Sequence, residues 1–157
     1  MSARPRTQAG FTVTELMVVV AIVGIIAALA APDMAEMVRR QRVKTAAFDV
    51  FAGLTMARSE AIKRNITVQV TPNNGDWSQG FVVLDANDRK VRDQQGWERM
   101  TMTGPNFVRF NSAGRLSSGG GGPATISIEA PNVYANYGKR CVTVESTGRA
   151  SSKEGAC

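Results

Sequence analysis

The chain has 157 residues and a mass of 16.8 kDa, which is the length of one domain with a sizeable core. Lysine and arginine outnumber the acids by 19 to 13, for a formal net charge of +6, and histidine is absent. A histidine-based catalytic triad, a histidine metal ligand and a histidine pH switch are therefore excluded. The two cysteines, Cys141 and Cys157, are too few for a four-ligand structural zinc site.

The N-terminal segment is polar at first and then strongly apolar. Residues 1–10 carry two arginines and no acid, and an uncharged apolar run follows at 16–31. Extended back to Phe11, the run has one charge, Glu15, and about 20 apolar residues in a helix cross a bilayer core. Three interpretations compete: a secretory signal peptide cleaved near 28–30, a plain membrane anchor, and a segment that is also an assembly interface.

The residues that precede the apolar run carry a specific resemblance. The sequence GFTVTE at 10–15, followed by the apolar run, resembles the class III leader of type IV pilins and pseudopilins. The resemblance implies that residues 1–10 are a leader, that prepilin peptidase cuts between Gly10 and Phe11, and that Phe11 is then methylated. Pro32 falls where such helices carry a kinking proline.

The same resemblance gives Glu15 a role in assembly. Cleavage frees an α-amine on Phe11, and in a packed filament the Glu15 carboxylate of one subunit neutralises the Phe11 amine of its neighbour. A buried charge is tolerated when it is paired. The alternative is that Glu15 lies at headgroup depth and stays hydrated.

Beyond the apolar run, the sequence follows a helical period. Residues 43–62 place apolar side chains at three- and four-residue spacing, which predicts an amphipathic helix face. We expect one nearly continuous helix over 11–64 that stops at Asn65. Its transmembrane half is expected at 11–31 and its amphipathic half at 32–64.

Two features of this helix carry further expectations. Pro32 and Gly53 are its expected bends or weak points, because proline removes a backbone donor and glycine is a poor helix former. The basic run at 39–44 is expected to be a solvated or headgroup-anchoring collar. The alternative is a docking surface for acidic residues of another subunit.

From residue 66 onward the period changes to two, and turn residues separate short apolar runs. The expected strands lie at 66–71, 80–85, 91, 97–102, 107–111, 125–129 and 141–145. Many short strands after one long helix indicate an α+β protein. The helix is expected to pack on an antiparallel, β-sandwich-like head over 65–157.

Two further stretches narrow the resemblance. Residues 57–62 (ARSEAI) and 80–88 (GFVVLDAND) resemble the helix end and the following strand and turn in minor pilins of the FimT/FimU/GspH group. The resemblance implies a filament subunit without enzymatic activity or cofactor. It also implies an inner-membrane, single-pass precursor with a periplasmic head, which later joins a pilus filament or its tip. The implied partners are prepilin peptidase, other minor and major pilins, and inner-membrane lipid.

Two functional alternatives stay open. The first is a GspH-like minor pseudopilin of a type II secretion system. The second is a DNA-binding minor pilin that acts in natural transformation, because Lys139, Arg140, Arg149 and Lys153 lie around the last hairpin and Gly148-Arg149 matches half of a Gly-Arg-x-Arg element. Phosphate binding needs several cations together, and a solvated basic loop is the favoured interpretation.

The expected periplasmic location lets Cys141 and Cys157 pair, because that compartment is oxidising. Such a disulfide is worth about 3 kcal/mol in the chain-entropy treatment and ties the last hairpin to the head. Two free thiols are the alternative.

Asp85, Asn87 and Asp88 suggest a calcium loop, but the basic residues at 89–90 stand where such a loop needs further oxygen donors and a glycine. The favoured interpretation is a polar turn. No catalytic constellation emerges from the sequence.

Overall fold

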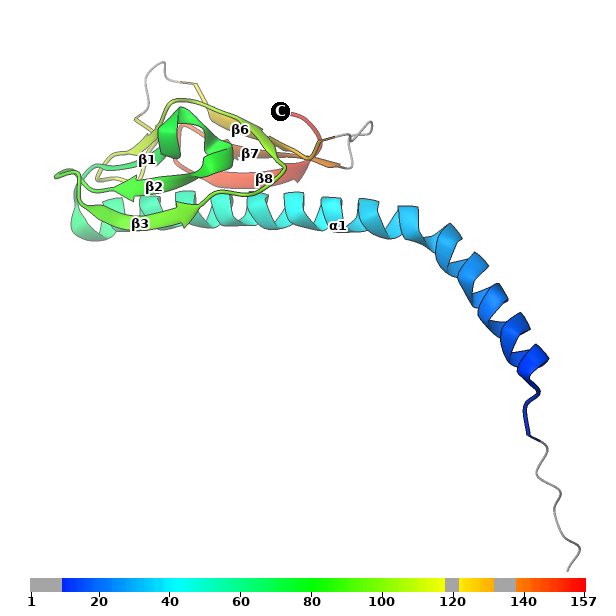
Figure 1. The fold of residues 1–157 in the computed structure, drawn as a ribbon. Coiled ribbons are helices and arrows are strands. Elements are labelled where there is room, and N and C mark those ends of the chain that lie inside the picture. The colour runs from blue at the N-terminus through cyan, green and yellow to red at the C-terminus, as the bar shows by residue number, and fades with distance from the viewer. Residues whose placement is uncertain (1–9, 118–121, 132–137) are drawn as a thin grey trace, which may run out of the picture. The chain divides into compact units, whose positions relative to one another are not determined.

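The computed structural model describes residues 10–117, 122–131 and 138–157, without the side chains of 29–33. The chain divides into two compact units, Met1–Met37 and Val38–Cys157, and each is described by itself. Figure 1 shows one long helix followed by strands. The elements are α1 (Val13–Arg64), β1 (Val68–Pro72), the 3-10 turns η1 (Asn73–Gly75) and η2 (Trp77–Gln79), β2 (Gly80–Leu84), β3 (Lys90–Gln95), β4 (Thr101–Thr103), β5 (Val108–Phe110), β6 (Ala124–Glu129), β7 (Lys139–Val144) and β8 (Ala150–Glu154).

In the first unit, Thr12 caps the start of α1. The backbone N–H of Glu15 donates to Oγ1 of Thr12 at 3.2 Å, and the N–H of Leu16 donates to the Thr12 carbonyl at 3.1 Å. A threonine with a glutamate three residues later is the sequence form of a capping box, and a carboxylate in the first turn suits the helix dipole. The helix therefore begins two residues later than predicted.

The described large apolar side chains of this first unit are exposed, from Phe11 at 79% through Leu16 at 58% to Ile26 at 61%. Over the described residues, no helix combines the length and the hydropathy that a membrane crossing needs. The transmembrane segment at 11–31 stays a prediction. The kink at Pro32 falls on a residue whose side chain lies outside the described part, and it also stays a prediction.

In the second unit, α1 buries one face against the head, which confirms the predicted amphipathic stripe. The buried positions recur every three or four residues: Val43, Ala46, Ala47, Val50, Leu54, Ala57 and Ala61. Gly53 is a contact point rather than a bend, because a Cβ there would meet the buried ring of Phe81 in β2. The helix continues through it to Arg64.

The helix stops at Asn65, as predicted. Asn65 has a φ of 54° in the left-handed region, its N–H donates to the Ile62 carbonyl at 3.2 Å, and the N–H of Ile66 donates to the Ala61 carbonyl at 3.1 Å. This pair of bonds is the Schellman arrangement that satisfies the last helical carbonyls.

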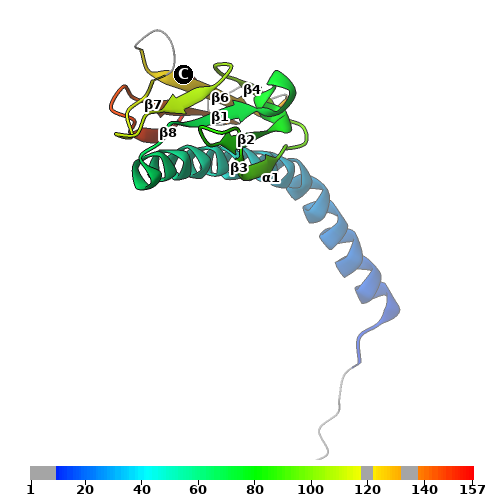
Figure 2. The same cartoon turned by 90° about the vertical axis from the view of Figure 1, so that its left-hand side faces the viewer.

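Two four-stranded sheets cover the buried face of the helix (Figure 2). Sheet A has the order β3-β2-β1-β5 and sheet B the order β4-β6-β7-β8, and neighbouring strands are antiparallel. Alternate residues of the inner strands point into one core shared with α1. The buried strand residues of that core include Val68, Val70, Phe81, Val83, Val108, Phe110, Ile126, Ile128, Val142 and Val144. The expected α+β class is confirmed.

Three aromatic rings form a cluster around β2. The ring centroid of Phe81 lies 6.2 Å from that of Trp77 and 6.4 Å from that of Trp97. Trp77 is 2% exposed and donates Nε1–H to the Pro105 carbonyl at 2.8 Å, while Trp97 donates to Oδ2 of Asp49 on α1 at 3.3 Å. Both indoles therefore combine apolar packing with a satisfied N–H.

Candidate assembly site

The Gly10–Phe11 bond lies ahead of the helix. Both residues are exposed and non-helical, and a Cβ at Gly10 would meet no atom within 4 Å. The described fold thus does not itself require a glycine at this position.

Glu15 is the only charged residue in the apolar segment at 11–31. It is exposed, and within the described part of the chain its carboxylate has no hydrogen-bond or ion-pair partner. Only its backbone N–H is used, in the helix cap. The side chain is therefore available for a cation that another molecule supplies.

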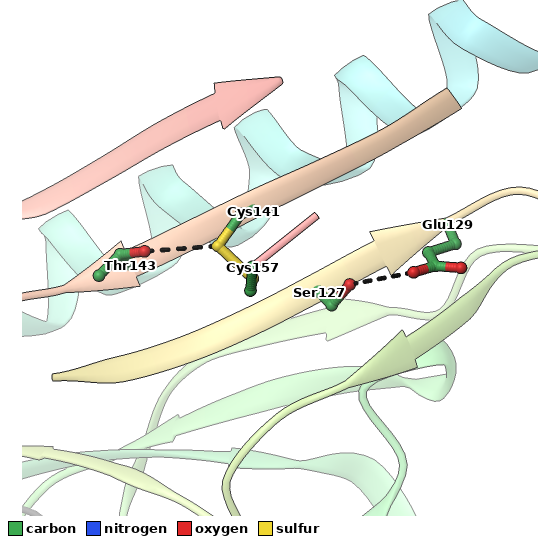
Figure 3. The surroundings of a disulfide bond; sticks show 5 residues. All are labelled: Ser127, Glu129, Cys141, Thr143 and Cys157. Atoms are coloured by element: carbon green, nitrogen blue, oxygen red, sulfur yellow. Dashed lines mark hydrogen bonds between the residues drawn. A yellow bond between two sulfur atoms is a disulfide. The ribbon is translucent and has the colours of Figure 1, made fainter. Parts of the chain in front are cut away.

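The C-terminal disulfide is formed, which confirms the predicted pair. Cys141 and Cys157 are joined with a Cα–Cα distance of 5.0 Å. Figure 3 shows the bond on the face of sheet B that carries Ser127 and Thr143, and Sγ of Cys141 lies 3.4 Å from Oγ1 of Thr143. Cys141 is 1% exposed. The link therefore holds the end of the chain over the outer face of sheet B.

The four basic residues of the DNA-binding alternative lie at two ends of the last hairpin. Arg140 pairs in register with Glu154, beside Lys139 and Lys153, whereas Arg149 follows the turn at the opposite end. Four strand residues separate the ends, roughly 13 Å. Lys139 is also engaged, since its Nζ lies 3.1 Å from Oε2 of Glu129. Lys139 and Lys153 share the outer face of sheet B with Cys141, whereas Arg140 lies on the opposite face and lines a pocket beside the helix. The structure therefore does not bring the four residues together.

Sequence reasoning missed Arg58, which joins two turns to the helix. Its Nε donates to the Gly114 carbonyl at 3.0 Å and its Nη2 to the Thr147 carbonyl at 3.5 Å. Gly114 and Gly148 both have positive φ, and a Cβ at Gly148 would meet the Gly114 carbonyl oxygen. The available signal was a repeated pattern, Ser-x-Gly-Arg, at 112–115 and 146–149.

The polar turn after β2 is organised by Asp85. The carboxylate is 4% exposed and accepts from the N–H groups of Asn87 at 2.8 Å and Arg89 at 3.0 Å, and from Arg89 Nε at 2.9 Å. Burial alone raises the pKa of Asp85, but these hydrogen bonds and the Arg89 charge outweigh it and lower the pKa below its ordinary value. The hydrogen bonds of the Asp85 carboxylate are thus made within the turn at 85–89.

Comparison with known proteins identifies the head. Residues 46–148 match the family model for type II transport protein GspH. The chain belongs to the GspH family. Residues 5–31 of this GspH-family protein also match the prokaryotic N-terminal methylation motif. The resemblance to minor pilins and pseudopilins is thereby confirmed.

Individual relatives agree with this assignment. Two fimbrial proteins of Pseudomonas aeruginosa are each 39% identical, over 97 and 90 residues, which is 57% of this chain in both cases. The GspH-family chain spans 63% and 58% of the length of these curated relatives.

Solved structures show the same fold. The type IV minor pilin FimU of Pseudomonas aeruginosa has a TM-score of 0.62 at 21% identity, over 73% of this chain and 90% of that one. The minor pseudopilin EpsH from the type 2 secretion system of Vibrio cholerae has a TM-score of 0.58 at 16% identity, over 72% and 97%.

Proposed function

We propose that the protein is a minor pilin that prepilin peptidase cuts between Gly10 and Phe11, and that helps to prime and assemble a type IV pilus. The observation that carries this proposal is a methylation motif at 5–31 in the same chain as a GspH-family head. The exposed, non-helical Gly10–Phe11 bond supports the cleavage step. The fimbrial proteins at 39% identity support the pilus.

The proposed precursor lies in the inner membrane with residues 11–31 inserted and the head in the periplasm. The disulfide supports an oxidising compartment for the head. The exposed apolar side chains of the first unit have no partner within the described chain, and lipid followed by neighbouring subunits would cover them.

In the filament, the Glu15 carboxylate pairs with the methylated Phe11 amine of a neighbouring subunit. An unpaired carboxylate in an apolar surrounding costs several kcal/mol, so a subunit docked out of register is disfavoured. The charge pair thus selects the correct axial position as well as contributing attraction.

Mass spectrometry of the protein recovered from cells tests the processing step. We expect an N-terminus at Phe11 with one added methyl group and with the disulfide intact. A mature N-terminus at Ala31 would show that residues 1–30 are an ordinary signal peptide and would overturn the proposal.

A substitution of Glu15 tests the pairing step. Glu15→Ala is expected to be processed and methylated normally but to be lost from purified filaments. Glu98→Ala, which removes an exposed acid of the head, is the matched control and should co-assemble like the parent chain. Equal recovery of both variants in filaments would contradict the pairing.

The second candidate is a minor pseudopilin of a type II secretion system. The observation in its favour is the fold shared with EpsH, because the match between the two structures covers 97% of the EpsH chain. Deletion of the gene separates the two candidates, because a pilin deletion removes surface pili whereas a pseudopilin deletion blocks export of secreted enzymes.

A further inference from the structure

A groove of about 470 Å³ lies between the second half of α1 and the outer strand of sheet B. Its helix side is apolar, since Phe48 is 66% exposed and Phe51 is half-buried. Ser152 of β8 and Arg140 of β7 form the opposite side. Figures 1 and 2 both show β8 close to the second half of α1. The groove therefore combines an exposed aromatic ring with the border of a sheet.

The strand β8 is an edge strand of sheet B, and some of its backbone N–H and C=O groups have no partner strand. The N–H of Gly155 donates to the Lys139 carbonyl at 2.9 Å, so Gly155 and every second residue before it face β7. Ser152 and Glu154 therefore point their N–H and C=O groups away from β7. In the described part of the chain, nothing hydrogen-bonds to these groups. One of these two residues, Ser152, lines the groove.

The other sheet borders are shorter than β8 or carry more charge. Exposed edges are commonly guarded by short length or by charge. β4 and β5 have three residues each, and β3 carries a charge at Lys90, Arg92 and Asp93. β8 has five residues, of which the first three, at 150–152, are uncharged and the last two, Lys153 and Glu154, are charged. β8 is therefore the described edge best suited to accept another strand.

The charges around the groove select the occupant. Lys44 and Arg140 line it, and within the described residues neither forms an ion pair, although Glu154 is the register neighbour of Arg140. The second unit as a whole, residues 38–157, carries 17 basic and 10 acidic residues, a formal net charge of +7. Two copies that met through β8 would bring these like charges together. The complementary occupant is an acidic segment of a different polypeptide.

We propose that this groove binds an extended acidic segment of another protein, which adds to sheet B as a fifth strand beside β8. The segment takes the free N–H and C=O groups of Ser152 and Glu154, as in other β-strand additions. The alternate side chains of the segment that face the groove carry both contacts, an apolar one against Phe48 and flanking carboxylates against Lys44 and Arg140. The assembly role proposed above supplies one source, another filament subunit, but the binding itself does not depend on that role.

The test uses the full chain in nanodiscs of zwitterionic phosphatidylcholine and a capped hexapeptide. In this peptide glutamate, valine and glutamate occupy alternate positions, with threonine at the positions between, so that one face carries both the apolar and the acidic side chains. Amide hydrogen exchange is measured with and without the peptide. We expect the N–H groups of Ser152 and Glu154 to exchange about ten-fold more slowly with the peptide, and that of Lys153, which faces β7, to change little. The same peptide with lysine in place of glutamate should bind about ten-fold more weakly.

Matched variants locate the contact. Phe48→Ala should weaken peptide binding about ten-fold, because it removes the apolar surface of the groove. Ile62→Ala removes another half-exposed side chain of α1 that lies outside the groove, and it should bind like the parent chain. Arg140→Glu should shift the preference toward the lysine peptide. Both helix substitutions change exposed side chains and leave the core intact.

Several outcomes would overturn the proposal. They are equal binding of the two peptides, slower amide exchange at residues away from β8 and not at β8, or no peptide binding at millimolar concentration. Each of them would leave the N-terminal processing and the Glu15 result unchanged. A loss of processing would in turn leave the peptide measurement unchanged, so the two proposals fail separately.

Discussion

Breaking the disulfide at its exposed end tests how strongly the last strand is tied to the head. Cys157 is exposed and Cys141 is buried, so Cys157→Ser removes the link and leaves the buried side chain in place. The two cysteines are 16 residues apart, and a closed loop of about this size stabilises by about 3 kcal/mol through the entropy of the unfolded chain. β8 offers little packing to offset the loss, because only its first residue, Ala150, is partly buried.

We therefore expect Cys157→Ser to lower the free energy of unfolding by about 3 kcal/mol. Urea unfolding followed by circular dichroism measures this difference. A reductant should produce the same loss in the parent chain and no further loss in the variant, which serves as the internal control. A loss below about 1 kcal/mol with unchanged cooperativity would refute the reasoning, because the loop would then not limit the entropy of the unfolded chain.

Three further substitutions test packing, turn geometry and acid stability. Gly53→Ala should destabilise by about 1–3 kcal/mol in urea unfolding, because the new methyl group meets the ring of Phe81 even though alanine is the better helix former; an unchanged midpoint would contradict the close contact. Arg58→Ala should cost about 1–3 kcal/mol by the same measurement, since the Gly114 carbonyl loses a charged donor, and Arg58→Lys should recover only part of it. Because the pKa of Asp85 is lowered from 3.8, its contribution is present above that value and is lost as the pH falls through the lower folded value. Asp85→Asn should therefore make the melting temperature fall less steeply with pH in strongly acidic solution. The same pH dependence of the melting temperature in the variant and the parent chain would contradict the stabilising role of the Asp85 carboxylate.

The helix and most strands could be predicted because their signals are local. The three- and four-residue spacing of apolar side chains from Val43 to Ile62 fixes the buried face of α1. Two-residue alternation locates β1, β5 and β6 to within about two residues, which is the usual uncertainty at element ends. The leader motif was equally readable, since its glycine, phenylalanine and glutamate lie within six residues.

The missed features depend on contacts between distant parts of the chain. The last hairpin was predicted, but the bounds of its second strand were not, because β8 has no apolar alternation and is held beside β7 by the turn at 145–149 and the disulfide. Arg58 reaches carbonyls 56 and 89 residues further along, and no local pattern encodes that distance. Helix propensity alone predicts a weak point at Gly53, because propensity ignores what packs against the helix. In the structure Phe81 occupies the space of the missing side chain.

The aromatic cluster gives the protein an intrinsic optical reporter. The chain has two tryptophans, and both indoles lie beside the Phe81 ring rather than near β8. Indole emission is therefore sensitive to the separation of β2 from its neighbours and insensitive to detachment of the last strand. An unchanged emission spectrum, together with faster deuterium uptake at β8, would be the spectroscopic signature of a head that opens first at its C-terminal border.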